Sequence, residues 1–416
     1  MDERKKVLIL TVDAGFGHRN AANAIAMAFS ESYGASCQVE VNNPLDDRRA
    51  PAMLRRTQTG HDKLVSQMPD IYKFQYDLTG TTVVFPVISQ ALVVLLYNII
   101  KETIRAHQPD VIVTTHPYYL APLSAIAALS KKPVPFITVV TDLTNVHRLW
   151  FQDTASLTLV PTQEAFQQGL LSGIPGERLR VTGIPINPNI NRETRSVETL
   201  RIELGWNLER TTLLVAGSKR VKHLENVLHE LNHADLPIQL VLVAGGDDRL
   251  YDYFSQVDWH LPVHIYNFVD CMPQFLHAVD GVIGKAGGLI VTESLACGLP
   301  LLLIDITPGT EDGNADFVLK HGAADYAANP GEALEILRHW LANDKHLLLE
   351  RHEKSLALGR VDSAYMIADC IYEVMGKGWL PKASPQYISK IRQLLQTVIL
   401  SSEKTHVGRG MRKSHR

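Results

Sequence analysis

Two glycine-rich turns, each directly after a short apolar run, contain residues that could bind or activate a phosphorylated substrate. The first is Gly15-Phe16-Gly17-His18, and the second is Lys285-Ala286-Gly287-Gly288. Glycines let the backbone approach a ligand closely, and the N–H groups at the start of a helix favour negative charge. We therefore expect Gly287 and Gly288 to bind a diphosphate. His18 could act as a base, because an imidazole can be neutral near pH 7.

The first turn is an incomplete dinucleotide-binding fingerprint. That fingerprint has a third glycine three residues beyond Gly17, where this chain has Asn20, and no acid follows a second strand in the expected place. The position of His18, at the mouth of a strand–turn–helix unit, instead favours a ligand site at the edge of an open sheet.

Polar side chains around the second turn suit a nucleotide sugar. Glu293 lies about one and a half turns into the next helix, where its carboxylate could accept two hydrogen bonds from a ribose diol. Glu311 and Asn314 follow the next apolar run, and carboxylate and amide groups suit the hydroxyls of a sugar. A leaving diphosphate also needs positive charge nearby. The candidates for that charge are Lys219, Arg220 and Lys285.

Further polar or small residues stand at the ends of other predicted strands. Because the carboxyl ends of parallel strands meet at one edge of a sheet, we expect these residues to face the same cleft. They are His116, Asp142, Gly217 and Ser218. No D-x-D motif occurs, and His116 and His147 lack a Cys or His partner at ligand spacing, so we predict neither a metal nor a cofactor.

Short apolar runs alternate with amphipathic stretches, which predicts an α/β protein with parallel sheets between helices. The pattern stops at Pro185–Arg195, an expected linker, and then restarts. We predict domains over residues 1–190 and 191–376, then a helix and a basic tail over 377–416. The predicted strands are Lys6–Val12, Cys37–Val41, Asp110–Thr115, Pro135–Thr141, Leu157–Pro161, Leu179–Thr182, Thr212–Ala216, Gln239–Ala244, His264–Phe268, Gly281–Gly284 and Pro300–Ile304.

Composition indicates a globular protein with no general attraction for nucleic acid. Apolar residues make up 45% of the 416 residues, charged residues make up 20%, and the net charge is -3. The four cysteines form no C-x-x-C pair, which favours reduced thiols, and the N-terminus fits no signal peptide. These features predict a cytoplasmic location.

Two segments bear on membrane contact. Thr81–Ile100 has the length to span a bilayer, but Pro86 and several polar residues interrupt it, so we expect a buried or interfacial helix. From Lys377 onward there are nine Lys or Arg residues and a single acid, Glu403. This stretch reads either as a solvated tail or as a contact with an anionic membrane. We predict a peripheral membrane protein.

Taken together, the motifs resemble those of the monogalactosyldiacylglycerol synthase and processive diacylglycerol glycosyltransferase family. That family is related to the N-acetylglucosaminyltransferase of peptidoglycan lipid synthesis. The similarity covers residues 5–330, in ordered blocks at matching spacing. The blocks are Gly15-x-Gly17-His18, Pro109–Val113, Thr115-His116-Pro117, Val140–Leu143, Trp150-Phe151, Val181–Pro185, Lys285–Gly288, Thr292-Glu293, Gly298–Pro300 and Pro308-Gly309-x-Glu311-x-x-Asn314.

The resemblance implies a GT-B fold, with an acceptor-binding first domain and a second domain that binds a UDP-sugar. It implies inverting transfer of a hexose to a lipid such as diacylglycerol, at the inner face of a membrane. In that frame His18 is the base and Asp142 a second catalytic residue, with Gly15, Gly17 and His116 on the acceptor side. The implied donor contacts are Gly217, Ser218, Phe268 and Val269 (the last two against uracil), Lys285, Gly287, Gly288, Glu293, Glu311 and Asn314.

Two departures from the family pattern keep other interpretations open. The family's GGGxG is here Ala216-Gly217-Ser218-Lys219-Arg220, and the Gln of its PGQE loop is Thr310. One alternative is a UDP-N-acetylglucosamine 2-epimerase of the same architecture, although Asp13 is the one carboxylate seen near His18. The other is a nucleotide-sugar-binding protein that has lost catalysis. The sequence leaves the sugar, processivity and oligomeric state open.

Overall fold

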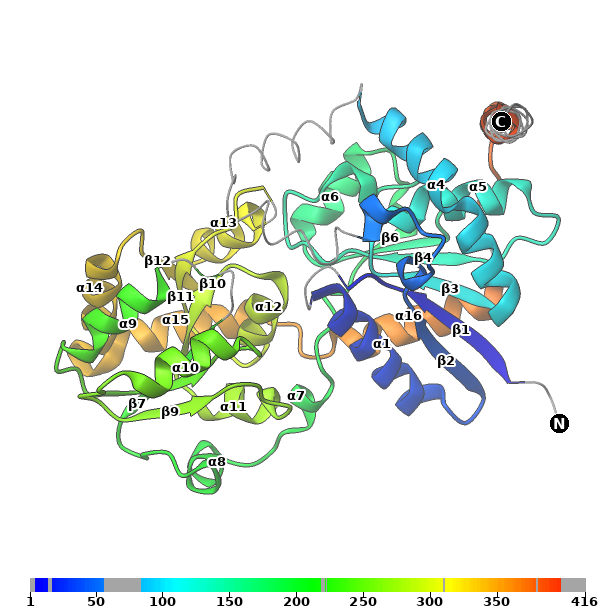
Figure 1. Cartoon of the computed structure of the whole chain (residues 1–416). Coiled ribbons are helices and arrows are strands. Elements are labelled where there is room, and N and C mark those ends of the chain that lie inside the picture. Colours follow the sequence, from blue (N-terminus) through cyan, green and yellow to red (C-terminus); the bar gives the residue numbers. More distant parts are fainter. Residues whose placement is uncertain are drawn as a thin grey trace, which may run out of the picture.

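The computed structural model describes residues 4–13, 17–55, 84–217, 221, 223–309, 311–378 and 381–397. The chain forms two lobes side by side, and each lobe contains a six-stranded sheet between layers of helices (Figure 1). The predicted α/β class with two Rossmann-like domains is therefore confirmed.

The first sheet has the order β2-β1-β3-β4-β5-β6, and all its strand pairs are parallel. The strands β3, β4 and β5 are buried along their whole length because both faces of the sheet are covered, by α4 and α5 on one side and by α1 and α16 on the other. The strands are β1 (Lys5–Leu10), β2 (Cys37–Asn42), β3 (Val111–Thr114), β4 (Phe136–Val139), β5 (Leu157–Val160) and β6 (Leu179–Val181). The helices are α1 (Gly17–Tyr33), α4 (Val84–His107), α5 (Leu120–Leu129), α6 (Gln163–Leu171) and α16 (Ser363–Lys377).

The second sheet has the order β12-β11-β10-β7-β8-β9 and is also parallel. The strands are β7 (Thr211–Ala216), β8 (Ile238–Val243), β9 (Val263–Tyr266), β10 (Gly281–Lys285), β11 (Leu301–Asp305) and β12 (Ala324–Tyr326). The helices are α8 (Val197–Leu204), α9 (Leu224–Asn232), α10 (Asp248–Gln256), α11 (Met272–Ala278), α12 (Gly288–Ala296), α13 (Asp312–Lys320), α14 (Pro330–Leu341) and α15 (His346–Leu358).

The strand order reverses once in each sheet, between β1 and β3 in the first and between β7 and β10 in the second. Open α/β sheets bind ligands outside the carboxyl ends of the strands at such a reversal. The turn that carries His18 follows β1, and His116 follows β3. The Gly287-Gly288 turn follows β10. The topology thus puts both predicted turns at reversal points.

One prediction about the domain boundaries needs correction. The expected linker contains the short helix α7 (Asn189–Arg192). The range 191–376, however, ends too late for the second domain, because α16 returns to the first. Its apolar face, including Ile367 and Ile371, packs with α1 and β1 in one core (Figure 1). Burial of this face on α1 is what brings the chain back.

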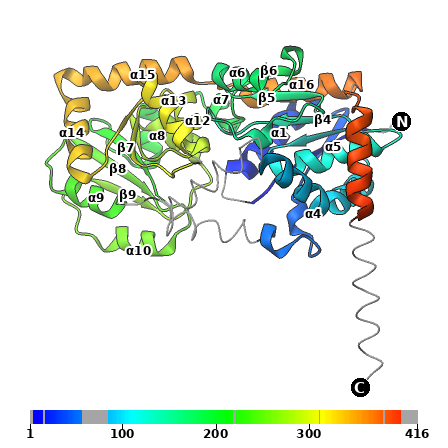
Figure 2. The same ribbon diagram turned by 90° about the horizontal axis from the view of Figure 1, so that it is seen from above.

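The helix α4 belongs to the first domain. It is long and apolar enough to cross a membrane, yet Leu92, Leu96 and Ile100 are buried in the core of the first sheet. A last helix, residues 385–397, lies against α4 and α5 through Ile391 (Figure 2). The helix α4 therefore packs as part of the first domain, which agrees with the buried or interfacial helix expected for Thr81–Ile100. Residues 81–83 lie outside the described ranges.

Candidate active site

His18 lies in the first turn of α1 with one ring nitrogen fixed by the protein. Its Nδ1 is 2.9 Å from the carbonyl oxygen of Thr115 and 3.1 Å from the hydroxyl of Thr141. Because a carbonyl oxygen can only accept, Nδ1 carries the proton, and Nε2 is the unprotonated nitrogen. Burial lowers the pKa of His18 to about 4. The imidazole is therefore neutral at pH 7, with its basic atom on Nε2.

Aromatic rings surround His18. The ring of His116 packs edge-on, with centroids 4.6 Å apart, and the ring of Trp150 lies 6.2 Å away. Nδ1 of His116 accepts a hydrogen bond from the backbone N–H of Tyr118 at 3.3 Å. The structure thus brings the predicted residues His18 and His116 together. Gly17 begins α1 with open space beside it, and Gly15 lies outside the described residues.

Asp142 contacts Trp150, one of the aromatic residues beside His18. Its Oδ2 accepts a hydrogen bond from Nε1 of Trp150 at 2.8 Å, and burial raises the pKa of its carboxyl. This bond fixes the backbone between Thr141, which contacts His18, and Leu143, which reaches the second domain. A direct catalytic role for Asp142 stays a prediction.

The Gly287-Gly288 turn touches the first domain directly. Gly287 precedes α12 with extended backbone angles, and Gly288 is the first residue of that helix. A Cβ placed on Gly288 would lie 3.1 Å from the carbonyl oxygen of Thr141. Glycine therefore allows the close approach of the two domains here. Thr141 contacts both predicted turns, the His18 turn through its hydroxyl and the Gly288 turn through its carbonyl.

Lys285 and Glu311 form an ion pair with each other. The ammonium of Lys285 contacts Oε1 of Glu311, and the two side chains are 19% and 9% exposed. Oε2 of Glu311 accepts a hydrogen bond from the backbone N–H of Thr307 at 2.9 Å. Lys285, one of the three candidate phosphate cations, and the predicted sugar carboxylate thus neutralise one another, close to Gly287. The other two candidates, Lys219 and Arg220, lie outside the described residues.

Asn314 has both amide atoms bonded to backbone groups. Its Oδ1 accepts from the N–H of Leu143 at 3.1 Å, and its Nδ2 donates to the carbonyl of Ala286 at 3.1 Å. The side chain is 3% exposed. The structure therefore places Asn314 at the domain interface and beside the Gly287-Gly288 turn.

Glu293 lies at the junction with the linker. Its carboxylate accepts a hydrogen bond from the backbone of Asn187, and burial raises its pKa to about 7. The residue is 9% exposed. The structure puts it on α12, as predicted from the spacing, but with a linker contact that the sequence did not indicate. Its ribose role stays a prediction.

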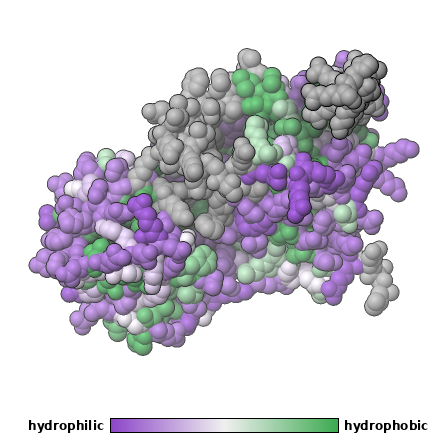
Figure 3. Space-filling view, in the orientation of Figure 1, coloured by the Kyte–Doolittle hydropathy of each residue, from purple (hydrophilic) through white to green (hydrophobic). Residues whose placement is uncertain are grey.

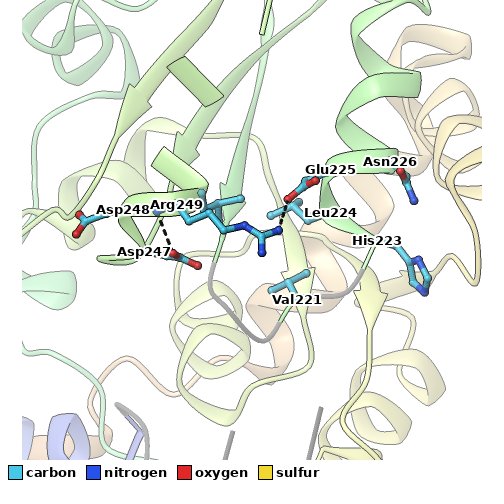
Figure 4. A pocket seen from close by; sticks show the side chains of 9 residues that line it. Val221, His223, Leu224, Glu225, Asn226, Asp247, Asp248 and Arg249 are labelled. Atoms are coloured by element: carbon cyan, nitrogen blue, oxygen red, sulfur yellow. Dashed lines mark hydrogen bonds and ion pairs between the residues drawn. The ribbon is translucent and has the colours of Figure 1, made fainter. Parts of the chain in front are cut away.

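A hollow of about 720 Å³ lies between the starts of α9 and α10 (Figure 4). Arg249 reaches across it to Glu225, with 3.3 Å between the charged atoms, and Asp247 caps α10 through the N–H of Arg249. Gly217 packs against Leu250, which lines the hollow, and a Cβ on Gly217 would lie 2.7 Å from the carbonyl oxygen of Val243. Gly217 is thus required for packing, and Ser218 lies outside the described residues.

The predicted uracil contacts follow β9. Phe268 is 62% exposed, and Val269 packs partly against the core of the second domain. Phe268 lies near Gly246, whose added Cβ would be 4.0 Å from its ring. An exposed aromatic ring at a strand end is suited to stacking on a base.

Two residues near His18, Arg19 and Asn43, were missed by the sequence reasoning, and others that it placed in motif blocks have contacts that it did not predict. Arg19 makes a two-bond ion pair with Asp13, at 2.7 and 3.0 Å, which joins the end of β1 to the first turn of α1. Asn43 donates to Asp13 at 3.1 Å. Thr115, Thr141 and Trp150 also contact the His18 ring or its neighbours. The positions of Asn43, Thr115 and Thr141 at or near strand ends were the signal that could have predicted these contacts.

Within the described ranges, no group of three or more His, Cys, Asp or Glu side chains could hold a metal ion. The site as described consists of a neutral base on the first domain and a glycine turn with polar neighbours on the second.

Comparison with known proteins assigns both halves of the chain. Residues 18–186 match the model of monogalactosyldiacylglycerol (MGDG) synthase, and residues 211–354 match the glycosyltransferase family 28 C-terminal domain. A probable monogalactosyldiacylglycerol synthase of Glycine max is 28% identical over 92% of this chain and 74% of its own length. The Spinacia oleracea enzyme is 29% identical over 89% of this chain and 73% of its own.

Solved structures share the architecture. Acinetobacter baumannii MurG superposes with a TM-score of 0.56 at 14% identity, over 89% of this chain and 99% of its own. Staphylococcus aureus MnaA, solved with UDP, also gives 0.56 at 15% identity, over 91% of this chain and 99% of its own. At such identities the likeness establishes the fold alone.

The two parallel sheets, with their glycine turns at the strand-order reversals, define the GT-B fold. The chain is, more particularly, a UDP-sugar-dependent glycosyltransferase related to the monogalactosyldiacylglycerol synthases, and the resemblance predicted from its motifs is confirmed. The family matches do not favour the 2-epimerase or the inactive binding protein.

Proposed function

We propose that the chain transfers a hexose from a UDP-sugar to the hydroxyl of diacylglycerol, with inversion at the anomeric carbon and without a metal. The names of the relatives at 28% and 29% identity, monogalactosyldiacylglycerol synthases, support this donor and acceptor class. The structural observation that supports it most is the double contact of Thr141, with the His18 ring and with Gly288.

In this reaction Nε2 of His18 takes the proton of the acceptor hydroxyl. The hydroxyl oxygen forms a bond to the anomeric carbon while the bond from that carbon to the diphosphate breaks, and UDP leaves. The N–H groups at the start of α12 stabilise the charge on the diphosphate. Lys285 can add positive charge if it turns from Glu311 towards the diphosphate.

The test is a panel of UDP-sugars, including UDP-galactose, UDP-glucose and UDP-N-acetylglucosamine, with diacylglycerol in detergent micelles. We expect a lipid product whose mass has increased by one hexose residue, together with released UDP. Isomerised sugar nucleotide without lipid would instead identify an epimerase. UDP binding without any turnover would identify a binding protein.

We propose further that the protein is peripheral on the inner, cytoplasmic face of a membrane. Apolar side chains gather on the surface over the first turns of α4, where Val87 is 66% exposed (Figure 3). The last helix packs against α4, and the chain beyond it is basic. Together they offer an apolar and a cationic contact for an anionic lipid surface.

Washing membranes separates this proposal from a spanning helix. Exposed charges are screened within roughly 10 Å at 0.1 M salt, so high salt or carbonate should release the protein. Retention in the pellet under both treatments would mean that α4 spans the bilayer.

A further inference from the structure

One chain of hydrogen bonds crosses the cleft between the two domains. On the first domain, the hydroxyl of Thr162, at the start of α6, donates to the carbonyl of Leu143 at 2.7 Å. The N–H of Leu143 donates to Oδ1 of Asn314 at 3.1 Å, and Nδ2 of Asn314 donates to the carbonyl of Ala286 at 3.1 Å. Ala286 immediately precedes the Gly287-Gly288 turn. These hydrogen bonds thus connect the first domain to the Gly287-Gly288 turn, where the sugar donor is expected to bind.

A second contact lies beside the first. The hydroxyl of Thr144 donates to the carbonyl of Gly313 at 2.6 Å. A Cβ on Gly313 would lie 2.3 Å from the carbonyl oxygen of Thr144, so no larger residue fits without moving the two domains apart. Leu143 itself is 4% exposed and packs in the core of the second domain, although it belongs to the first. The segment 141–144 is therefore anchored in both domains.

This segment also holds the base. Thr141 contacts Nδ1 of His18 at 3.1 Å, and only Asp142 separates Thr141 from Leu143. The side chain of Asp142 is tied to Trp150 at 2.8 Å. Asn314 joins Leu143 of this segment to Ala286, so a shift of Asn314 would move the Gly287-Gly288 turn relative to the segment that holds His18.

We infer that Asn314 and Gly313 form an interdomain latch, which sets the distance between the base and the donor turn, and that Asn314 is a positioning residue instead of a sugar ligand. Both of its amide atoms are already bonded to backbone groups, and 3% exposure leaves little surface for a hydroxyl. The inference rests on the proposed function for its kinetic consequence, but the latch itself is a structural feature that can be measured without activity.

Three variants test the latch. Asn314→Ala removes both hydrogen bonds, Gly313→Ala adds a Cβ at the interface and leaves Asn314 intact, and Thr144→Val removes one hydroxyl from the opposite domain. Gly376→Ala in α16 is the matched control, since a Cβ there meets nothing within 4 Å. Circular dichroism verifies that each variant is folded.

The kinetic arm compares kcat, donor KM and the preference among UDP-hexoses. A misplacement of about 1 Å can cost about 10²-fold in rate. We expect Asn314→Ala and Gly313→Ala to lower kcat by about 10²-fold with the same order of preference among donors. Thr144→Val should lower kcat a few-fold, and the control should match the wild type. If Asn314→Ala changes the donor preference while Gly313→Ala behaves as the wild type, Asn314 is a sugar ligand and the latch is wrong.

The structural arm measures the radius of gyration by small-angle X-ray scattering, with no substrate present. We expect Asn314→Ala and Gly313→Ala to be more extended than the wild type and the Gly376→Ala control. Identical scattering from all four proteins overturns the latch, whatever the activity. Absence of transfer by the wild type with every donor would reject the proposed function and leave this arm as an independent test.

Discussion

The two halves of the cleft use their polar residues differently. On the first domain, His18 has one ring nitrogen bonded to Thr115 and, among the described residues, no hydrogen bond to Nε2. On the second domain, Lys285, Glu311 and Asn314 are all bonded to protein groups. The comparison suggests that the first half supplies the reacting group, while several motif residues of the second half set its geometry.

Replacing His18 gives the largest expected effect and tests the first half of the comparison. His18→Ala removes the base while leaving the donor turn in place. General base catalysis contributes typically 10²–10⁴-fold, so we expect kcat to fall by about that factor with UDP affinity unchanged. The measurements are single-turnover kinetics and calorimetry with UDP.

The control for His18 is His339→Ala, because that histidine is exposed on α14, away from the cleft. We expect it to behave as the wild type. Near-normal turnover by His18→Ala would mean that the base lies elsewhere, and the contrast between the two halves would fail.

The Lys285–Glu311 pair gives the next effect, on stability. Both side chains are mostly buried, so Lys285→Met leaves a buried carboxylate without its partner. Removing one member of such a pair costs roughly 3–5 kcal/mol, whereas replacing both is often close to neutral. Thermal unfolding should therefore show a large loss for Lys285→Met and recovery in Lys285→Met/Glu311→Gln. Equal stability of the single and the double variant would show that the unpaired Glu311 carboxylate costs no stability, which would contradict the proposed role of the ion pair.

Glu293 gives a third test of the second domain, because its ionisation should make the stability of the protein depend on pH. Burial raises the pKa of its carboxyl from the ordinary value of 4.5 to about 7. The protonated carboxyl is therefore favoured by folding, and this contribution is complete below pH 4.5 and is lost as the pH rises through about 7. Glutamine stays neutral, so Glu293→Gln should be more stable than the wild type above pH 7, by up to about 3 kcal/mol, and similar near pH 4.5. Denaturant unfolding at pH 5 and pH 8 measures this; a pH-independent difference would rule out the buried ionisation.

The fold was predictable from the sequence to a large extent, because parallel strands covered on both faces are continuous apolar runs. Predicted Cys37–Val41 corresponds to β2, and predicted Gly281–Gly284 corresponds to β10. The strand β12 was missed, because Ala324-Asp325-Tyr326 is only three residues long and contains a central aspartate instead of an apolar run. The return of α16 was also missed, since an apolar helical face does not reveal which domain it covers.

The sequence predicted where the site residues lie, at the ends of strands, better than it predicted what each residue contacts. His18 and His116 meet because they follow the neighbouring strands β1 and β3. The partners of Asn314 and Glu293 are the backbone groups of Leu143 and Asn187, from distant segments. Backbone groups are identical in every residue, so no pattern of side chains identifies them.

The stereochemistry of the product is the most direct test of a base on one domain acting on a donor held by the other. UDP-hexoses carry the sugar in the α configuration, and a single displacement by an oxygen activated at His18 must invert that carbon. Proton NMR of the glycolipid made from the accepted UDP-hexose should therefore show a β linkage. An α-linked product would contradict the account, because it would require a different reaction path from the one in which His18 activates the attacking hydroxyl.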